Sequence, residues 1–132
     1  MTTRVEPTFE IKSWDEQPWH EAGGGRKLTQ ATVTKIYHGP LEATGTMHYV
    51  MAYADEGTAT YVGLELVDGM LDGRTGTFVL KDVGGFEGGI ARSAIEIVEG
   101  SGSGELGHLR GTASVDATKK DVQTMTLDYD LA

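Results

Sequence analysis

Four histidines and 20 carboxylates, without any cysteine, are the residues from which this chain could build a reactive site. The histidines (His20, His38, His48 and His108) lack the spacing of a metal motif, and none has an aspartate at helical spacing, so we expect no metal. The absence of cysteine excludes a disulfide, a thiolate nucleophile and a Cys-ligated zinc site. No Ser-His-Asp phrase stands out. The glycine run 100–104 lacks the Lys-Ser/Thr pair and the helix of a phosphate loop.

Alternating methionine and tyrosine mark one candidate for a ligand-contacting surface. Met47, Tyr49, Met51 and Tyr53 lie two residues apart, so in a strand their side chains share one face. We expect that face to point into the molecule. Two interpretations stay open: the four side chains pack a core, or they line a cavity in which the tyrosine hydroxyls orient a ligand.

The elements that must position these residues are strands, and the segment 58–86 shows this most clearly. Residues 60–66 and 75–80 each alternate with period two, the pattern of a strand with one buried face. The dipeptides Asp68-Gly69 and Asp72-Gly73 predict turns. In the second run Phe78 shares a face with Gly76 and Leu80.

The orientation of the first of these runs decides the place of Glu65. The apolar side chains of Val62, Leu64 and Leu66 alternate with Glu65, which predicts that the apolar three are buried and that Glu65 points outward. The opposite assignment stays open, because the outer wall of an oligomer-forming barrel can also be apolar. Glu65 is therefore either a surface or interface residue or a site residue inside the fold.

Length and composition predict one small all-β domain over residues 1–132. The chain contains 19 Gly and only 3 Pro, and it is rich in Thr and Val, which suits short strands joined by glycine turns. Residues 15–27, with Pro18 and three consecutive glycines, predict a loop. About eight strands are expected, over residues 8–14, 28–38, 41–53, 60–66, 75–80, 90–98, 109–117 and 122–131.

An antiparallel up-and-down meander of eight strands is expected to close into a barrel, because an open sheet leaves unpaired edges. The interior of such a barrel is filled by side chains or holds one small ligand. A two-sheet sandwich is the alternative.

The net charge of −9 argues against binding to nucleic acid or to anionic membranes. No apolar run is long enough to span a membrane and no signal core precedes the first strand, so we expect a cytoplasmic protein.

Several phrases resemble a known bacterial family: FEIKSWDE at 9–16, ATYVGLE at 59–65, GRTGTFVL at 73–80, FEGGI at 86–90, GSGSGEL at 100–106, LRG at 109–111 and TLDYDL at 126–131. Together they resemble the domain-of-unknown-function family DUF3224, whose members are similar to allene oxide cyclase barrels and share a phrase with dirigent proteins. The resemblance implies an eight-stranded antiparallel barrel with an apolar cavity, no cofactor, and assembly into a homo-oligomer such as a dimer or trimer.

The resemblance also implies site residues. Glu10 matches a first-strand Glu-Ile phrase of allene oxide cyclases in which the glutamate is a proposed catalytic group; this would direct Glu10, Lys12 and Trp14 toward the cavity. Strand alternation instead places Phe9 inside and Glu10 outside, so both orientations stay open. Trp14 is expected to cap a barrel mouth or to cover its bottom. The chain departs from the family pattern at Lys81-Asp82, where Gln-His is expected, and at Ile95, where Trp is expected.

Three functions follow, and the interior of the barrel discriminates between them. A wide pocket with an ionisable group would favour a cofactor-free isomerase or cyclase that acts on an apolar substrate, with Glu10, Lys12 or Glu65 as catalytic groups. A pocket with only apolar walls would favour a carrier or sensor of a hydrophobic metabolite. A packed interior would leave a structural or partner-binding module. In the first two functions Trp14, Tyr49, Met51, Tyr53 and Phe78 are the expected ligand contacts.

Overall fold

The structure is a computed structural model that describes residues 2–118 and 120–131. Within these residues it contains nine strands and one short 3-10 helix, η1. In chain order they are β1 (Thr3–Val5), β2 (Thr8–Gly23), β3 (Arg26–His38), β4 (Leu41–Asp55), β5 (Thr58–Leu71), β6 (Arg74–Glu87), β7 (Ile90–Ile97), η1 (Gly104–Leu106), β8 (Arg110–Ala117) and β9 (Gln123–Asp130). No helix in these residues is long and apolar enough to cross a membrane.

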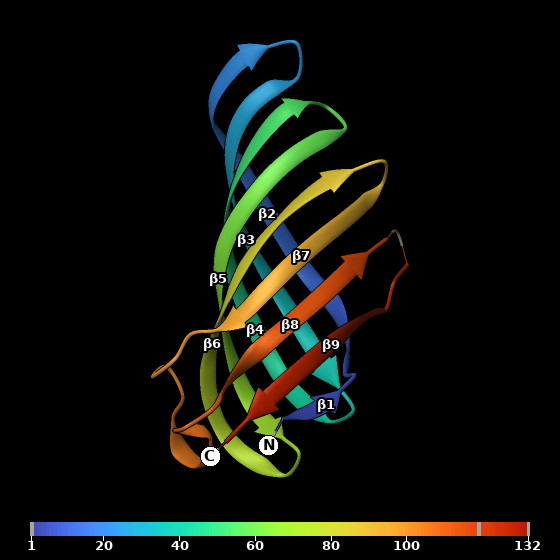
Figure 1. Cartoon of the computed structure of the whole chain (residues 1–132). Coiled ribbons are helices and arrows are strands. Elements are labelled where there is room, and N and C mark those ends of the chain that lie inside the picture. The colour runs from blue at the N-terminus through green and yellow to red at the C-terminus, as the bar shows by residue number, and fades with distance from the viewer. Residues whose placement is uncertain (1, 119, 132) are drawn as a thin grey trace.

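The strands close into a barrel-like ring, as the sequence predicted. Each strand from β2 to β9 pairs antiparallel with the next, and β9 returns to β2 through Thr8–Thr124 and Phe9–Gln123. The ninth strand, β1, was not expected; it precedes Pro7 and extends the pairing along β9. Pro7 has no N–H to give to a ladder, which accounts for the interruption between β1 and β2. Figure 1 shows the β2–β3, β4–β5 and β6–β7 hairpins reaching beyond the tip of β8 and β9.

Two predicted irregular segments are in fact strand. The predicted loop 15–27 is the tip of the β2–β3 hairpin, whose turn lies at Gly24 and Gly25 with φ of +65° and +78°. The Asp68-Gly69 turn is also wrong, because both residues lie inside β5 opposite Thr44 and Ala43. A side chain at Gly69 would overlap the backbone of β4, so this glycine permits close strand approach.

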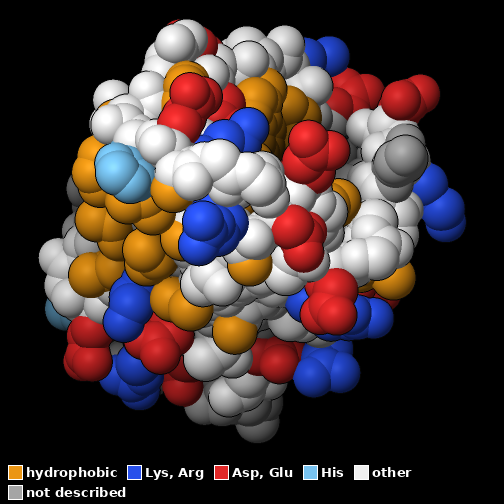
Figure 2. Space-filling view, turned by 90° about the horizontal axis from the view of Figure 1, so that it is seen from above, with side chains coloured by type: hydrophobic (Ala, Val, Ile, Leu, Met, Phe, Trp, Pro, Cys, Tyr) orange, Lys and Arg blue, Asp and Glu red, His pale blue; other side chains and the backbone are white. Residues whose placement is uncertain are grey.

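The predicted orientation of β5 is wrong as well. Val62, Leu64 and Leu66 lie on the outer wall with 47%, 55% and 49% of their surface exposed, whereas Glu65 is buried. Pairing decides this: Glu65 is opposite Met47, whose side chain points inward and is fully buried. Alternation identified the two faces of the strand but not which face the ring encloses. Figure 2 shows hydrophobic side chains gathered on one side of the barrel, beside a histidine.

Buried side chains pack one end of the barrel. A cluster of buried residues from most of the strands, including Phe9, Phe78 and Leu127, packs there against Leu106 of η1, which has no exposed surface. A second and smaller cluster, which includes Val33, Met47 and Tyr61, lines the interior toward the longer hairpins. The barrel is therefore closed by its core at the end near η1 and only partly filled at the other.

Candidate functional site

A pocket of about 340 Å³ lies in the interior, and Tyr49, Met51 and Tyr61 of the second cluster are part of its wall. Its walls come from β2 to β8, and most of the side chains are apolar or aromatic. Three side chains of the Lys, Asp and Glu types line it: Lys35, Asp82 and, in the turn between β4 and β5, Glu56. Six aromatic rings surround the space: Phe9, Trp14, Tyr49, Tyr53, Tyr61 and Phe86. An apolar pocket with few convergent polar groups has the usual character of a small-molecule site.

A β-bulge in β2 brings Ile11 and Trp14 to the same pocket. The register with β3 shifts between Ile11 and Ser13, so one extra residue interrupts the alternation and both side chains line the cavity. The Trp14 ring lies 6.0 Å from the ring of Tyr49, which in turn contacts Tyr61 edge to face at 5.2 Å. Edge-to-face and tilted contacts of this kind order aromatic walls.

Glu16 anchors the aromatic wall near the mouth. Its carboxylate accepts hydrogen bonds from Trp14 Nε1 at 3.0 Å, Thr29 Oγ1 at 2.7 Å and Tyr53 Oη at 2.7 Å. Partial burial raises the pKa of Glu16, but these three hydrogen bonds and the charge of Lys27 together outweigh it and hold the pKa below its usual range. Glu16 therefore stays ionised and fixes the orientation of two rings of the pocket.

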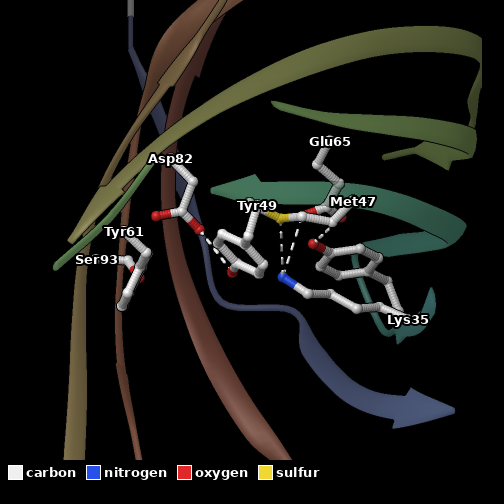
Figure 3. A network of polar contacts seen from close by, with 8 residues as sticks. Lys35, Met47, Tyr49, Tyr61, Glu65, Asp82 and Ser93 are labelled. Carbon is white, nitrogen blue, oxygen red and sulfur yellow. Dashed lines mark hydrogen bonds and ion pairs between the residues drawn. The ribbon is translucent and has the colours of Figure 1, made fainter. Parts of the chain in front are cut away.

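A buried ion pair forms the floor beneath the pocket. Lys35 Nζ lies 3.1 Å from Glu65 Oε1, and the other carboxylate oxygen of Glu65 accepts the hydroxyl of Tyr37. Lys35 also contacts Met47 Sδ at 3.8 Å and lies over the ring of Phe9, 4.9 Å from its centroid. Figure 3 shows the Lys35 nitrogen between its two partners, Met47 and Glu65. Both charges are thus paired, as burial requires.

Asp82 is the acidic group of the site itself. Only 2% of its surface is exposed, and its Oδ2 accepts the hydroxyl of Tyr49 at 3.2 Å. The other oxygen, Oδ1, has no hydrogen-bond partner among the described residues. Burial raises the pKa of Asp82, although the charge of Lys35 and the hydroxyls of Ser93 and Tyr49 lower it in part. The Ser93 hydroxyl is close enough to act on this pKa, but its hydrogen bond is to Tyr61, and Oδ1 stays without a partner among the described residues. A buried carboxyl with a free acceptor and a raised pKa is a feature of functional sites.

Tyr49, Tyr61 and Ser93 complete the polar part of the pocket. Burial and the neighbouring Asp82 carboxylate raise the pKa of Tyr49 well above its usual range, so its phenol donates to Asp82 and remains neutral. Tyr61 Oη and Ser93 Oγ lie 2.7 Å apart on the side of Asp82 away from Lys35 (Figure 3). Together these hydroxyls could orient a polar group of a bound molecule.

Only some of the site residues expected from the sequence line the pocket. Four of them do: Trp14, Tyr49, Met51 and Tyr53. Phe78 does not, because it belongs to the core that closes the other end. Glu65 lies inside the barrel and pairs with Lys35 beneath the pocket, but it is not part of the pocket wall.

The two remaining expected residues, Glu10 and Lys12, lie outside the pocket. Their charged groups pair with each other at 2.9 Å, with 34% and 52% of their side-chain surface exposed. The hydrogen bond from Lys12 lowers the pKa of Glu10. The orientation toward the cavity that the resemblance implied is thus corrected, and strand alternation, which placed Glu10 outside, described the local geometry.

Sequence reasoning missed Lys35, Asp82, Glu16, Tyr61 and Ser93 as site residues. One signal for Lys35 was present, because it stands between Val33 and Tyr37 on the apolar face of a strand. Asp82 was noticed only as a departure from the family pattern. Among the described residues, no three His, Asp or Glu side chains gather closely enough to hold a metal ion.

Comparison with known proteins identifies relatives but no activity. A family model described as "Protein of unknown function (DUF3224)" matches residues 5–129. A crystal structure of a protein with unknown function from the DUF3224 family of Shewanella oneidensis is similar, with a TM-score of 0.81 and 29% sequence identity over 100% of this chain and 99% of that one. No curated protein matches. The similarity to allene oxide cyclases and dirigent proteins stays a prediction.

Proposed function

Because the chain belongs to the DUF3224 family, whose function is unknown, we propose a function from the site itself: the protein binds one small, largely apolar molecule inside its barrel. The observation that supports this most is the contrast between the two ends. One end is packed by core side chains, whereas the other keeps a pocket of about 340 Å³. Protein interiors are normally close-packed, so a hollow inside the ring with mainly apolar and aromatic walls supports a ligand site.

The wall chemistry narrows the kind of molecule. Six rings and the side chains of Ile11, Met51 and Val115 offer apolar contact, which contributes roughly 25 cal/mol per Å² of apolar surface removed from water. Lys35 and Tyr53 are already bound to Glu65 and Glu16, and Glu56 lies at the hairpin tip. The other polar groups of the pocket gather around Asp82, Tyr61 and Ser93. The ligand therefore has a hydrophobic body and a single polar end that reaches these groups.

Catalysis on the bound molecule is the second candidate, and Asp82 is the observation that favours it. A passive carrier of a hydrophobic metabolite needs no ionisable group in its wall, whereas Asp82 and Lys35 both line this pocket. With its raised pKa, the carboxyl could exchange a proton with a substrate in a cofactor-free isomerisation or cyclisation. The rings would hold one conformer and exclude water. In this proposal Asp82 takes the acid–base role that the resemblance implied for Glu10.

Two measurements test the binding proposal. Native mass spectrometry of freshly purified protein would reveal a co-purifying small molecule as a mass above that of the chain. Fluorescence of the neutral dye Nile red would report the pocket directly. Ala91 lines the pocket, whereas Ala94 on the same strand is exposed. Ala91→Trp should therefore abolish dye binding and Ala94→Trp should leave it unchanged. Equal dye binding in both variants would refute the proposal.

A further inference from the structure

The buried charges of the barrel do not balance. Among the described residues the buried charged side chains are Lys35, Glu65 and Asp82. Lys35 pairs with Glu65, whose second oxygen is occupied by Tyr37. When Asp82 is ionised, the interior thus carries one negative charge without a cation of its own. A buried charge is normally paired, so an ionised Asp82 calls for a positive charge next to its carboxylate.

The free oxygen of Asp82 defines where that charge belongs. Oδ2 receives the phenol of Tyr49, and Oδ1 has no partner in the described part of the chain. A carboxylate is an acceptor only. The group that completes this site must therefore donate a hydrogen bond, and a charged donor would satisfy both the oxygen and the charge.

The aromatic rings around Asp82 suit a cation for a separate reason. Rings attract ammonium groups over their faces, and pockets of several rings are used to bind amines. The chain already places two of its own ammonium groups this way: Lys35 over Phe9, and Lys27 over Tyr53 at 4.7 Å from the ring centroid. Phe9 and Tyr53 both line the pocket.

The charge along the pocket also disfavours an anionic ligand. Glu56 and Asp82 both line it, and the only cation in its wall among the described residues, Lys35, is paired with Glu65. The chain as a whole carries a net charge of −9, which raises the local concentration of cations at its surface. A fatty acid or another carboxylate would thus meet two acidic groups and no unpaired base.

We propose that the ligand is a hydrophobic amine bound as its ammonium ion, with an N–H group donating to Asp82 Oδ1 and its carbon body against the rings of Tyr49, Tyr61 and Trp14. This assignment rests on the proposed binding function and names its ligand class. Tyr61 and Ser93 are placed to accept or donate further hydrogen bonds at the same end.

Displacement of Nile red by matched probes tests the assignment. Phenylbutylamine, phenylbutanol and phenylbutanoate share one hydrocarbon body and differ in the polar end. One charge-assisted hydrogen bond corresponds to a factor of about ten or more in affinity. The amine should therefore displace the dye at about tenfold lower concentration than the alcohol, and phenylbutanoate should not compete. Equal midpoints for amine and alcohol would overturn the assignment.

Two variants locate the effect. Asp82→Asn should abolish the preference for the amine, whereas Asp68→Asn, which removes a carboxylate from the exposed face of β5, should retain it. If the preference survives in Asp82→Asn, the assignment is wrong.

The trimethylammonium analogue of phenylbutylamine provides a test on the unaltered protein. It is a cation without an N–H group, so it should bind more weakly than the amine. Equal affinity would overturn the proposed hydrogen bond to Asp82.

The same experiment separates this inference from the proposal beneath it. Nile red that binds to the unaltered protein and not to Ala91→Trp, together with no amine preference, would leave the binding function and remove the amine. Failure of Nile red and of all three probes to bind would remove both.

Discussion

Lys35 and Glu65 stand 30 residues apart in the chain and face each other inside the barrel, with Lys35 Nζ 3.1 Å from Glu65 Oε1. Their exposed fractions are 5% and 2%. Such a pair is stable only when the remaining groups are also satisfied, and here Tyr37 and Phe9 supply the additional contacts. The pair supports the pocket floor, because Lys35 is also part of the pocket wall.

Removing one partner of this pair should lower the free energy of unfolding far more than replacing both partners by uncharged residues. Lys35→Met leaves a buried carboxylate without its cation and should lower the free energy of unfolding by about 3–5 kcal/mol. The double variant Lys35→Met/Glu65→Gln should recover most of that loss. Urea denaturation of the two single variants and the double variant measures the coupling. A double variant as unstable as the sum of the singles would show that the two side chains are independent.

The space around Glu65 predicts an effect at Gly45. A side chain there would overlap the carboxylate of Glu65 and the ring of Tyr37, so Gly45→Ala should destabilise the protein by about 1–3 kcal/mol through overpacking. Gly57 is a suitable control, because its nearest neighbour is at ordinary contact distance. Gly57→Ala should change the unfolding free energy by less than about 0.5 kcal/mol. Thermal unfolding of both variants compares them directly.

The raised pKa of Asp82 predicts that the effect of Asp82→Asn on the free energy of unfolding depends on pH. Its folded-state pKa is raised by burial, so folding favours the protonated form, and this group reduces stability as pH rises through the folded pKa. Asp82→Asn should therefore be more stable than the unaltered protein at pH 7, by on the order of 1 kcal/mol. The gain should vanish near pH 3, below the pKa of about 3.9 of an unfolded aspartate.

Denaturation at both pH values measures this difference. The groups that act on Asp82 are Lys35, Tyr49, Glu65 and Ser93, and none of them changes in the variant. Asp68→Asn controls for the loss of one negative charge on the outer face. A gain of the same size at both pH values would contradict the assignment to Asp82.

Glu10 should be dispensable for ligand binding. It pairs with Lys12 on the outer surface and does not line the pocket, so Glu10→Gln should bind Nile red and phenylbutylamine as the unaltered protein does. Asp82→Asn should instead lose amine preference. A tenfold or greater loss of affinity in Glu10→Gln would contradict this and support Glu10 as a site residue, as the resemblance implied.

The expected homo-oligomer stays a prediction, and the outer wall of the barrel suggests where it would form. Val50, Val62, Leu64, Leu66 and Val83 are each roughly half exposed, and Val62 is paired with both Val50 and Val83 across the neighbouring strands. We expect a second copy of the chain to cover this strip. Leu64→Glu should lower the oligomeric mass in size-exclusion chromatography with light scattering, with little loss of unfolding free energy. An unaltered protein that is monomeric at all concentrations would contradict this.

Much of the fold was determined by the sequence alone. Period-two alternation is a direct consequence of backbone geometry, so most strands, the Asp72-Gly73 turn and closure into a ring could be predicted. The Met47–Tyr53 face was correctly expected to point inward, and Trp14, Tyr49, Met51 and Tyr53 line the pocket. These residues have strong local signals, because side chains two apart share a face whatever the strand pairs with.

Tertiary structure alone decided which polar groups meet. Alternation cannot say which face of β5 the ring encloses; pairing of Glu65 with Met47 does. The bulge between Ile11 and Ser13, which reverses the faces of β2 and turns Trp14 inward, has no local signature in the sequence. Lys35, Tyr49, Asp82 and Ser93 come from four strands. Only ring closure and register bring them together, because hydrogen bonding between strands, rather than distance along the chain, determines which side chains become neighbours.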